Sequence, residues 1–430
     1  MSEVLTPVAA RRVFLLLTAT RWFPVGLVVS LLVLWILEQG LSVSTALLAF
    51  AFQGLLIFVL ELPTSGFADA FGRRPVLVAS AVVNVVASGV LLFADSFWTF
   101  AVAAGLQGVF RALDSGPLEA WYVDTVHATK PGADVDRALA AQGSVLGATI
   151  AVGAVVSGGL VAWDPLPVES ALLLPLLAWA ALNVVHLVAV VVLMKEPRTH
   201  VDTTGVRRAM TSVRQAPGVV RDGLGLLRHN RVLLGVILVE VFWSTGMVVF
   251  ETFQPIRLAE MVGGEEAAGA LMGPVAAAGW GVFALGSALA GLASGRIGVA
   301  RTAIVSRILN GLGAVVMGLV AGPAALIAAY LLTYGLHGTG GPMHDALLHR
   351  EAQARNRATV LSMSSMVGFA AFSLAAPALG LLAEGASTQV AMVTAGAFSV
   401  LGAFFYLPAR RAERDRAGAI PVATDDQALR

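Results

Sequence analysis

Long apolar runs recur along this chain, and each is long enough to cross a lipid bilayer. The first reads "VFLLLTATRWFPVGLVVSLLVLWIL", and comparable runs follow at short intervals until the polar C-terminal tail. An α-helix needs about 20 apolar residues to span the bilayer core. The composition agrees, because 57% of the residues are hydrophobic and only 13% are charged. A soluble domain carries roughly 25% charge. The sequence therefore predicts an all-α integral membrane protein.

We expect twelve membrane-spanning helices, most of them joined by short turns. Their approximate ranges are 13–37, 42–69, 75–94, 97–127, 135–162, 170–194, 232–261, 267–294, 299–320, 323–349, 357–384 and 387–408. The one long connection falls after the sixth helix. The sequence thus predicts two pseudo-symmetric six-helix bundles (6+6) at 1–194 and 232–409, a cytoplasmic linker at 195–231 and a cytoplasmic tail at 410–430.

The basic residues predict the orientation in the membrane. Of the 28 lysines and arginines, Arg21 and Arg111 fall within spans and Arg257 near the outer end of the seventh helix. We expect the remaining 25 on one face, with both termini. Short cytoplasmic loops are enriched in Lys and Arg, so this face and both termini are predicted to be cytoplasmic. The acids on the opposite face are Glu38, Asp95, Asp164, Glu265 and Glu266.

The stretch "ELPTSGFADAFGRR" carries a Gly-x-x-Asp-x-x-Gly-Arg-Arg pattern directly after the second helix. With the 6+6 topology, this chain resembles the major facilitator superfamily. The stretches "SGPLEAWYVD" and "RATVLS" further resemble a bacterial branch of drug:proton antiporter-like members. The resemblance implies multi-pass insertion in a bacterial inner membrane. It also implies that the pattern clamps the two halves on the cytoplasmic side in the outward-open state, with Asp124 taking part. The clamp residues are Gly66, Asp69, Gly72, Arg73, Arg74 and Asp124.

Three ionisable residues share one depth within the spans. Arg21, Glu61 and Glu119 each lie about eight residues from the inner end of their helix, or roughly 12 Å at 1.5 Å per residue. One arginine neutralises one carboxylate, which leaves the other a candidate to hold a proton. The group is either coupling machinery or a static ion network that fixes helix packing. Both interpretations stay open at this point.

Further side chains are candidates for the proton or substrate pathway. Arg111 and Asp114, three residues apart, are expected to pair on one helix face. Trp121 and Tyr122 are expected to line a cavity beside Glu119. The remaining candidates are Glu240, His337 and Asp345. The spacing of the histidines on the tenth helix does not place them on one face, so no metal site is expected.

The linker and the fifth helix carry two smaller predictions. In "GVVRDGLGLLRHNR", Val219, Val220, Leu224 and Leu227 share a helical face, which indicates either an amphipathic surface helix or a solvated basic linker. Gly143 and Gly147 have the four-residue spacing that allows close helix packing in lipid.

Several function classes lack support in the sequence. The chain has no cysteine, which excludes thiol chemistry, and no phosphate-binding loop or nucleophile motif. We therefore expect no enzyme activity, no cofactor other than the proton gradient, no nucleic-acid partner and a monomer in the lipid bilayer. The sequence favours a proton-coupled carrier that exports hydrophobic or amphipathic small molecules by alternating access. The alternatives are an importer or facilitator of a polar or anionic solute, and a non-transporting sensor or scaffold.

Overall fold

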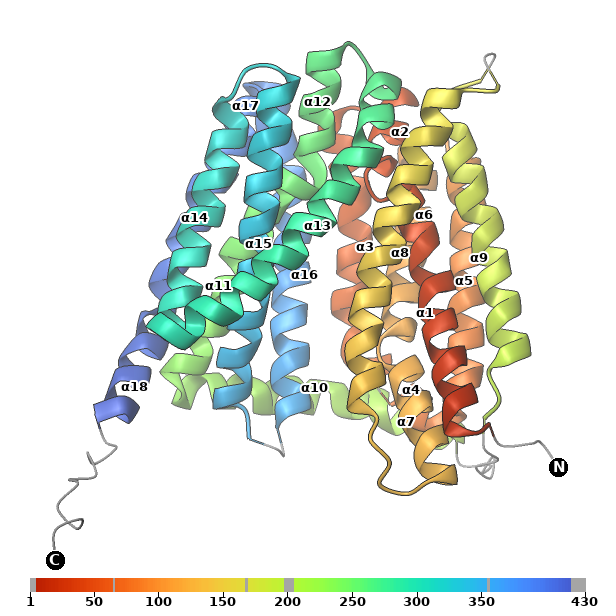
Figure 1. Cartoon of the computed structure of the whole chain (residues 1–430), viewed down its shortest axis with the longest axis vertical. Coiled ribbons are helices and arrows are strands. Elements are labelled where there is room, and N and C mark those ends of the chain that lie inside the picture. Colours follow the sequence, from red (N-terminus) through yellow and green to blue (C-terminus); the bar gives the residue numbers. More distant parts are fainter. Residues whose placement is uncertain (1–4, 65, 167–168, 197–204, 354–355, 419–430) are drawn as a thin grey trace, which may run out of the picture.

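The computed structural model describes residues 5–64, 66–166, 169–196, 205–353 and 356–418, and every regular element among them is helical (Figure 1). The earlier helices are α1 Pro7–Val28, α2 Leu32–Glu38, α3 Val43–Thr64, α4 Phe67–Phe71, α5 Arg73–Leu92, α6 Phe97–Asp114, α7 Pro117–Thr129, α8 Asp136–Trp163 and α9 Leu173–Leu193. The later elements are α11 Arg231–Val248, η1 Val249–Phe253, α12 Gln254–Val262, α13 Glu265–Ile297, α14 Val299–Leu319, α15 Pro323–Glu351, α16 Arg357–Gly385, α17 Thr388–Leu401, η2 Gly402–Tyr406 and α18 Leu407–Gly418. Between them lies α10, Gly205–His229.

Within the described ranges, ten helices are long and apolar enough to cross a membrane, so the chain is a multi-pass membrane protein. In this count α1 with α2 forms one span, Pro7–Glu38, and α11 to α12 forms another, Arg231–Val262. The expected spans at 97–127 and 323–349 correspond to α6 with α7 and to α15, which are not among the ten. The total of twelve spans in a 6+6 arrangement therefore stays a prediction.

The expected single helix at 97–127 is wrong, because the chain breaks after Asp114. Gly116 has φ 91°, a left-handed conformation that glycine adopts at little cost, and Pro117 starts α7. The missing turn leaves Asp114 at the end of α6 and Glu119 in the first turn of α7. Both carboxylates thus lie beside the break between α6 and α7.

The helices before α10 pack mainly on one another, and so do the helices after it. Helix α1 contacts α8 and α9, and α3 contacts α6, whereas α13 and α14 both contact α15. The earlier set meets the later one most extensively between α3 and α16 and between α8 and α13, and α2 also contacts α12 and α13. Figure 1 shows these two helix sets side by side.

Glycines on α8 allow close contacts with neighbouring helices, but these glycines are not the pair expected from the sequence. A Cβ atom on Gly153 would meet Phe23 and Gly26 of α1, and one on Gly158 would meet Ala270 and Gly273 of α13. By contrast, a Cβ on Gly143 would meet no atom within 4 Å, and one on Gly147 would have ordinary contact with Trp280. The interhelical approach therefore uses the glycines one to three turns further along α8.

The linker contains a helix, α10. Of the two interpretations of this segment, an amphipathic helix or a solvated basic linker, the structure favours the helix. Helix α10 contacts α3 and α4 at one end and α11 and α16 at the other. Gly66 faces the side chain of Ser212, and Gly223 faces Met363. The buried side of α10 includes Ala216 and Leu227, whereas Leu224 of the expected apolar face is 48% exposed. Helix α10 thus bridges the two helix sets.

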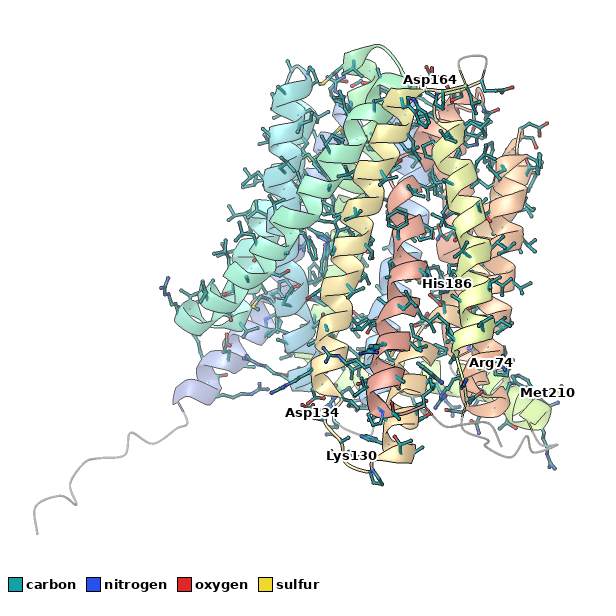
Figure 2. The ribbon with its side chains drawn as sticks, turned by 45° about the vertical axis from the view of Figure 1, so that its right-hand side comes forward. Arg74, Lys130, Asp134, Asp164, His186 and Met210 are labelled. Atoms are coloured by element: carbon teal, nitrogen blue, oxygen red, sulfur yellow. The ribbon has the colours of Figure 1, made fainter. Side chains whose placement is uncertain are left out.

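The start of α1, α10 and α18 all lie at the same end of the molecule, the lower one in Figure 1. We call this end the termini face and the opposite end the far face. Figure 2 shows Arg74, Lys130, Asp134 and Met210 at the termini face, Asp164 at the far face and His186 between them. That the termini face is cytoplasmic stays a prediction.

Candidate functional site

A cavity of about 250 Å³ lies between α1, α3, α6, α7, α8 and α16. We call it the central cavity. It is lined by Arg21, Trp22, Ile57, Glu61, Arg111, Asp114, Ser115, Gly116, Leu118, Glu119, Gln142, Ser365 and Phe369. The last two residues belong to α16, so both helix sets contribute to its wall. Polar groups gathered on a concave, partly apolar wall are typical of small-molecule sites.

A buried ion pair forms one side of the central cavity. The Arg21 Nε atom lies 2.9 Å from Asp114 Oδ2, and the two side chains are 5% and 15% exposed. The Arg21 guanidinium also lies 4.2 Å from the ring centroid of Phe110 and 4.8 Å from that of Trp22. A carboxylate and two aromatic faces therefore compensate a cation that would be costly to bury alone.

Two further carboxylates line the same cavity. The Glu119 carboxylate accepts a short hydrogen bond from Nε2 of Gln142 on α8. Glu61 is half-buried on α3, and its carboxylate accepts no hydrogen bond among the described residues. The Arg111 guanidinium lies 5.5 Å from the Trp22 ring centroid. Arg21, Glu61 and Glu119, predicted to share a depth, thus line one cavity.

The partner of Asp114 differs from the expected one. The spacing predicted a pair with Arg111 on the same helix, but the structure pairs Asp114 with Arg21 on α1. The break after α6 explains the difference, because Asp114 is the last residue of its helix and its side chain is free to reach α1.

Trp121 and Tyr122 lie away from the central cavity. Trp121 is fully buried, and its Nε1 donates to the backbone oxygen of Lys195 at 3.0 Å. The Tyr122 ring stacks on Phe14 with centroids 4.6 Å apart. The expectation that this pair faces a ligand is corrected here: both side chains anchor α7 against α1 and the end of α9.

At the termini face, Arg73 joins two carboxylates. It forms an ion pair with Asp69 four residues earlier, and its Nε lies 3.4 Å from Asp124 Oδ2. Arg74 points elsewhere and donates to the Val191 backbone oxygen at 2.7 Å. Among the described residues, these polar contacts all lie within the earlier helix set. In this conformation they do not tie the two sets together.

Glu196 is part of this network and was missed because it lies just beyond the expected end of the sixth helix. Its carboxylate accepts from the backbone amides of Arg73 at 2.6 Å and Arg74 at 3.3 Å. Gly72, with φ 97°, turns the chain into α5 at this point. Glu413 repeats the arrangement, accepting from the amides of Val299 and Ala300 at 3.1 Å each. Each carboxylate satisfies amides at a helix start that has no capping side chain of its own.

We expect Glu196→Ala to lower the stability of the protein by about 1 kcal/mol, the usual cost of removing a helix cap. The chain has no cysteine that a thiol-reactive dye could label, but it has eight tryptophans. Thermal unfolding is therefore best followed by intrinsic tryptophan fluorescence in detergent. Glu413→Ala should lower the midpoint similarly, whereas Asp222→Ala, which removes an exposed carboxylate of α10, should leave it unchanged. A wild-type midpoint for Glu196→Ala would contradict the capping role.

A second polar cluster lies among the later helices, around Glu240 of α11. His344 Nε2 lies 3.0 Å from Glu240 Oε1, and Ser364 Oγ donates to the same oxygen at 3.0 Å. The other ring nitrogen of His344 lies 2.8 Å from the Tyr406 hydroxyl. Of the other candidates on α15, His337 accepts from Trp243 Nε1 at 3.1 Å, whereas Asp345 is exposed.

Arg307 was also missed, because its position near the predicted start of the ninth helix led us to count it with the basic residues of the termini face. It lies within α14 and is 1% exposed. Its guanidinium lies 4.5 Å from the Trp243 ring centroid, and Nη1 donates to Asn310 at 3.1 Å. The count of 25 basic residues on one face is corrected accordingly.

In the described part of the chain, two polar contacts join the helix sets at the far face. The Glu384 carboxylate of α16 accepts from the Ser44 amide at 2.7 Å and the Ser44 hydroxyl at 2.9 Å. Glu266 of α13 accepts from the Ala171 amide at 2.9 Å. Both contacts bring a carboxylate of the later set to the backbone of the earlier one, which holds the sets together at this face.

The fold has close counterparts among solved structures. A nucleoside transporter, NupG, superimposes with a TM-score of 0.74 at 11% identity and covers 93% of this chain and 98% of its own. A POT family transporter in complex with a thioalcohol conjugated peptide has a TM-score of 0.70 at 14% identity, covering 94% and 96%. A structure from work on proton dependent oligopeptide transporters has a TM-score of 0.68 at 13% identity, covering 95% and 100%. At these identities the likeness shows the fold alone.

A comparison with curated proteins found no match. The family profile of the Major Facilitator Superfamily matches residues 14–341, about three quarters of the chain. The solved structures show the same fold, and the profile identifies a secondary transporter built from membrane-spanning helices. The chain belongs to the Major Facilitator Superfamily.

Proposed function

We propose that this transporter exports hydrophobic or amphipathic small molecules in exchange for protons, by alternating access. The observation that carries the proposal is the excess of carboxylates in the central cavity. Two cations, Arg21 and Arg111, line it together with three carboxylates, Glu61, Asp114 and Glu119. With every group ionised the cavity has one surplus negative charge, which either a proton or a cationic substrate neutralises. Competition of the proton and the substrate for that charge couples proton movement to substrate movement.

The carboxylate that we propose to exchange the proton is Glu61 or Glu119. Asp114 is occupied by Arg21 at 2.9 Å, so its charge is already balanced. Glu119 accepts a hydrogen bond from a neutral partner, Gln142, which leaves the charge of the carboxylate unbalanced. The apolar part of the wall, formed by Trp22, Ile57, Leu118 and Phe369, suits the body of an amphipathic molecule.

The cluster around Glu240 supports a second protonatable site. Glu240, His344 and Tyr406 form a chain of hydrogen-bonding groups between α11, α15 and η2. Buried carboxylates and histidines inside membrane bundles commonly serve as proton relays. We assign His337 to the same region through its bond to Trp243, and Asp345 to its exposed edge.

The clamp of Asp69, Arg73 and Asp124 is proposed to engage the later helix set in the opposite conformation. In the present one the sets are joined at the far face by Glu384 and Glu266. A carrier alternates between such closures. We further propose that the termini face is cytoplasmic, that the bundles lie at 1–194 and 232–409, and that a monomer works in a bacterial inner membrane with the proton gradient as its energy source.

The test is gradient-driven movement of a cationic dye, ethidium, through purified protein in liposomes. An imposed pH gradient of one unit is expected to drive ethidium toward the acidic compartment, and collapse of the gradient by a protonophore should abolish the movement. Empty liposomes are the control. If ethidium and a panel of neutral and cationic amphiphiles all fail to move with the gradient, the exporter proposal is wrong.

The competing function is import or facilitated uptake of a polar or anionic solute. It is favoured by Arg21 and Arg111 in the cavity wall, and by solved structures of similar fold described as nucleoside and peptide transporters. Counterflow of uridine or dialanine without any dye transport would support this function. A sensor or scaffold would show neither movement.

A further inference from the structure

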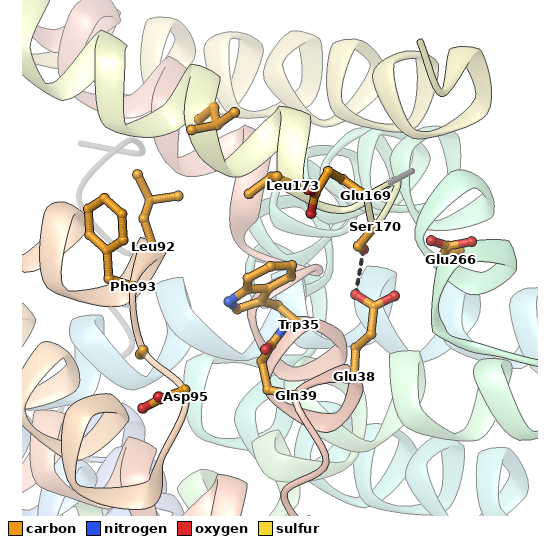
Figure 3. A pocket seen from close by; sticks show the side chains of 12 residues that line it. Trp35, Glu38, Gln39, Leu92, Phe93, Asp95, Glu169, Ser170, Leu173 and Glu266 are labelled. Carbon is orange, nitrogen blue, oxygen red and sulfur yellow. Dashed lines mark hydrogen bonds between the residues drawn. The ribbon is translucent and has the colours of Figure 1, made fainter. Parts of the chain in front are cut away.

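A second cavity, of about 730 Å³, opens at the far face and shares no lining residue with the central cavity. We call it the vestibule. It lies between the end of α2, the end of α5 and the start of α9, with one residue of α13 at its edge. Figure 3 shows Trp35 in its middle, Leu92 and Asp95 on one side and Glu38 and Ser170 on the other.

The ionised lining of the vestibule is entirely acidic. Its carboxylates belong to Glu38, Asp95, Glu169 and Glu266, and no lysine or arginine lines it. Glu38 accepts from Ser170 Oγ at 2.5 Å, and Glu266 accepts from the Ala171 amide at 2.9 Å. The side chains of Asp95 and Glu169 accept no hydrogen bond among the described residues, and both are exposed. The carboxylates of Asp95 and Glu169 are therefore available to a positively charged ligand.

An independent observation indicates that a ligand with an acceptor belongs here. The Trp35 side chain is 6% exposed, and its Nε1 is buried without a hydrogen-bond partner in the described part of the chain. Figure 3 shows the indole nitrogen turned toward the side of the vestibule where Leu92 and Asp95 lie. A buried donor without an acceptor is unfavourable, and an oxygen of a bound molecule would satisfy it.

The four carboxylates do not form a metal site. No group of three or more His, Cys, Asp or Glu side chains in the described residues converges as metal ligands do. Separated carboxylates around an apolar wall that includes Leu92 and Leu173 instead suit a cation attached to a larger body.

We propose that the vestibule binds an organic cation, namely a protonated amine whose body carries a hydrogen-bond acceptor. The ammonium group lies near Asp95 and Glu169, and an ether or hydroxyl oxygen accepts from Trp35 Nε1. The apolar part of the molecule rests on the Trp35 ring and on Leu92. The site is separate from the central cavity and does not depend on the direction or coupling of transport.

The test uses the absence of cysteine from the chain, since one introduced cysteine then reports one position. Gln39→Cys places a thiol in the vestibule wall, and its reaction with a maleimide is followed in uncharged detergent. Propranolol, an amine with ether and hydroxyl oxygens, is expected to slow the labelling about fivefold at about four times its dissociation constant, because the unoccupied fraction of the site then falls to about one fifth. Propranolol glycol, in which a hydroxyl replaces the amine, should not slow it.

Two variants in the Gln39→Cys background locate the ligand. Asp95→Asn and Trp35→Phe should each raise the half-protecting propranolol concentration about fivefold, through loss of an ion contact and of one hydrogen bond. Glu265→Gln, which removes a far-face carboxylate outside the vestibule, should not. The control thiol is Trp163→Cys, at an exposed position beyond the lining. Equal protection by both compounds, or unchanged concentrations in both variants, would overturn the proposal. A failure of ethidium transport would not overturn it, because binding in the vestibule does not depend on transport.

Discussion

We expect Asp114→Asn to cause the largest loss of stability of any single substitution in the central cavity. Arg21 would keep its charge at 5% exposure but lose its carboxylate partner. Removal of one partner from a buried ion pair costs about 3 kcal/mol or more, because the other charge stays buried and uncompensated. The Phe110 and Trp22 rings would recover only part of that cost. Thermal and denaturant unfolding, followed by tryptophan fluorescence, measures the loss.

A double-mutant cycle separates the ion pair from general disturbance of the cavity. Arg21→Met with Asp114→Asn should destabilise less than the sum of the two single substitutions, because neither charge is then left alone. Asp222→Asn, at an exposed position on α10, is the matched control and should unfold like the wild type. Additive losses in the cycle would show that Arg21 and Asp114 are not energetically coupled.

The sequence predicted the depth of a side chain along its helix better than the direction in which the side chain points. Rise along a helix is fixed at 1.5 Å per residue, so Arg21, Glu61 and Glu119 could be assigned to one level, and the structure has all three on one cavity. Which groups touch depends on the rotation of each helix about its axis and on breaks within it. The turn at Gly116 breaks a helix that hydropathy alone makes continuous, and it sends Asp114 to Arg21.

Arg307 and Glu196 were missed for different reasons. Arg307 is eight residues into α14, whose start at Val299 agrees with the expected range 299–320, but it was counted with the surface charges of the loop before that helix. Glu196 follows the last turn of the sixth span, and its amide partners on α5 are 122 or more residues away in sequence. Trp121 was expected beside Glu119, but two residues that are two positions apart on a helix face different sides, and Trp121 points away from the central cavity. Such contacts require the tertiary arrangement.

The largest effect on function is expected from Glu61→Gln or Glu119→Gln, whichever removes the exchanging carboxylate and so uncouples transport from the proton gradient. One proton exchanged per substrate across one pH unit supports about tenfold accumulation, because a pH unit is worth about 1.4 kcal/mol. If the surplus charge of the central cavity couples the two movements, loss of the exchanging carboxylate removes this link. The accumulation ratio of ethidium should then fall to about 1, the equilibrium value. Liposomes with an imposed gradient give this ratio directly.

Exchange without a gradient distinguishes uncoupling from misfolding. A variant that lacks only the exchanging carboxylate keeps the apolar wall of the central cavity but loses the charge for which ethidium competes, so counterflow of a neutral amphiphile that the wild type transports should continue in the uncoupled variant. Glu265→Gln, at the far face outside both cavities, should keep both accumulation and counterflow. If Glu61→Gln and Glu119→Gln both accumulate ethidium like the wild type, the coupling site is not in the central cavity. In that case Glu240→Gln becomes decisive, because Glu240 with His344 and Tyr406 forms a second protonatable cluster within the helices.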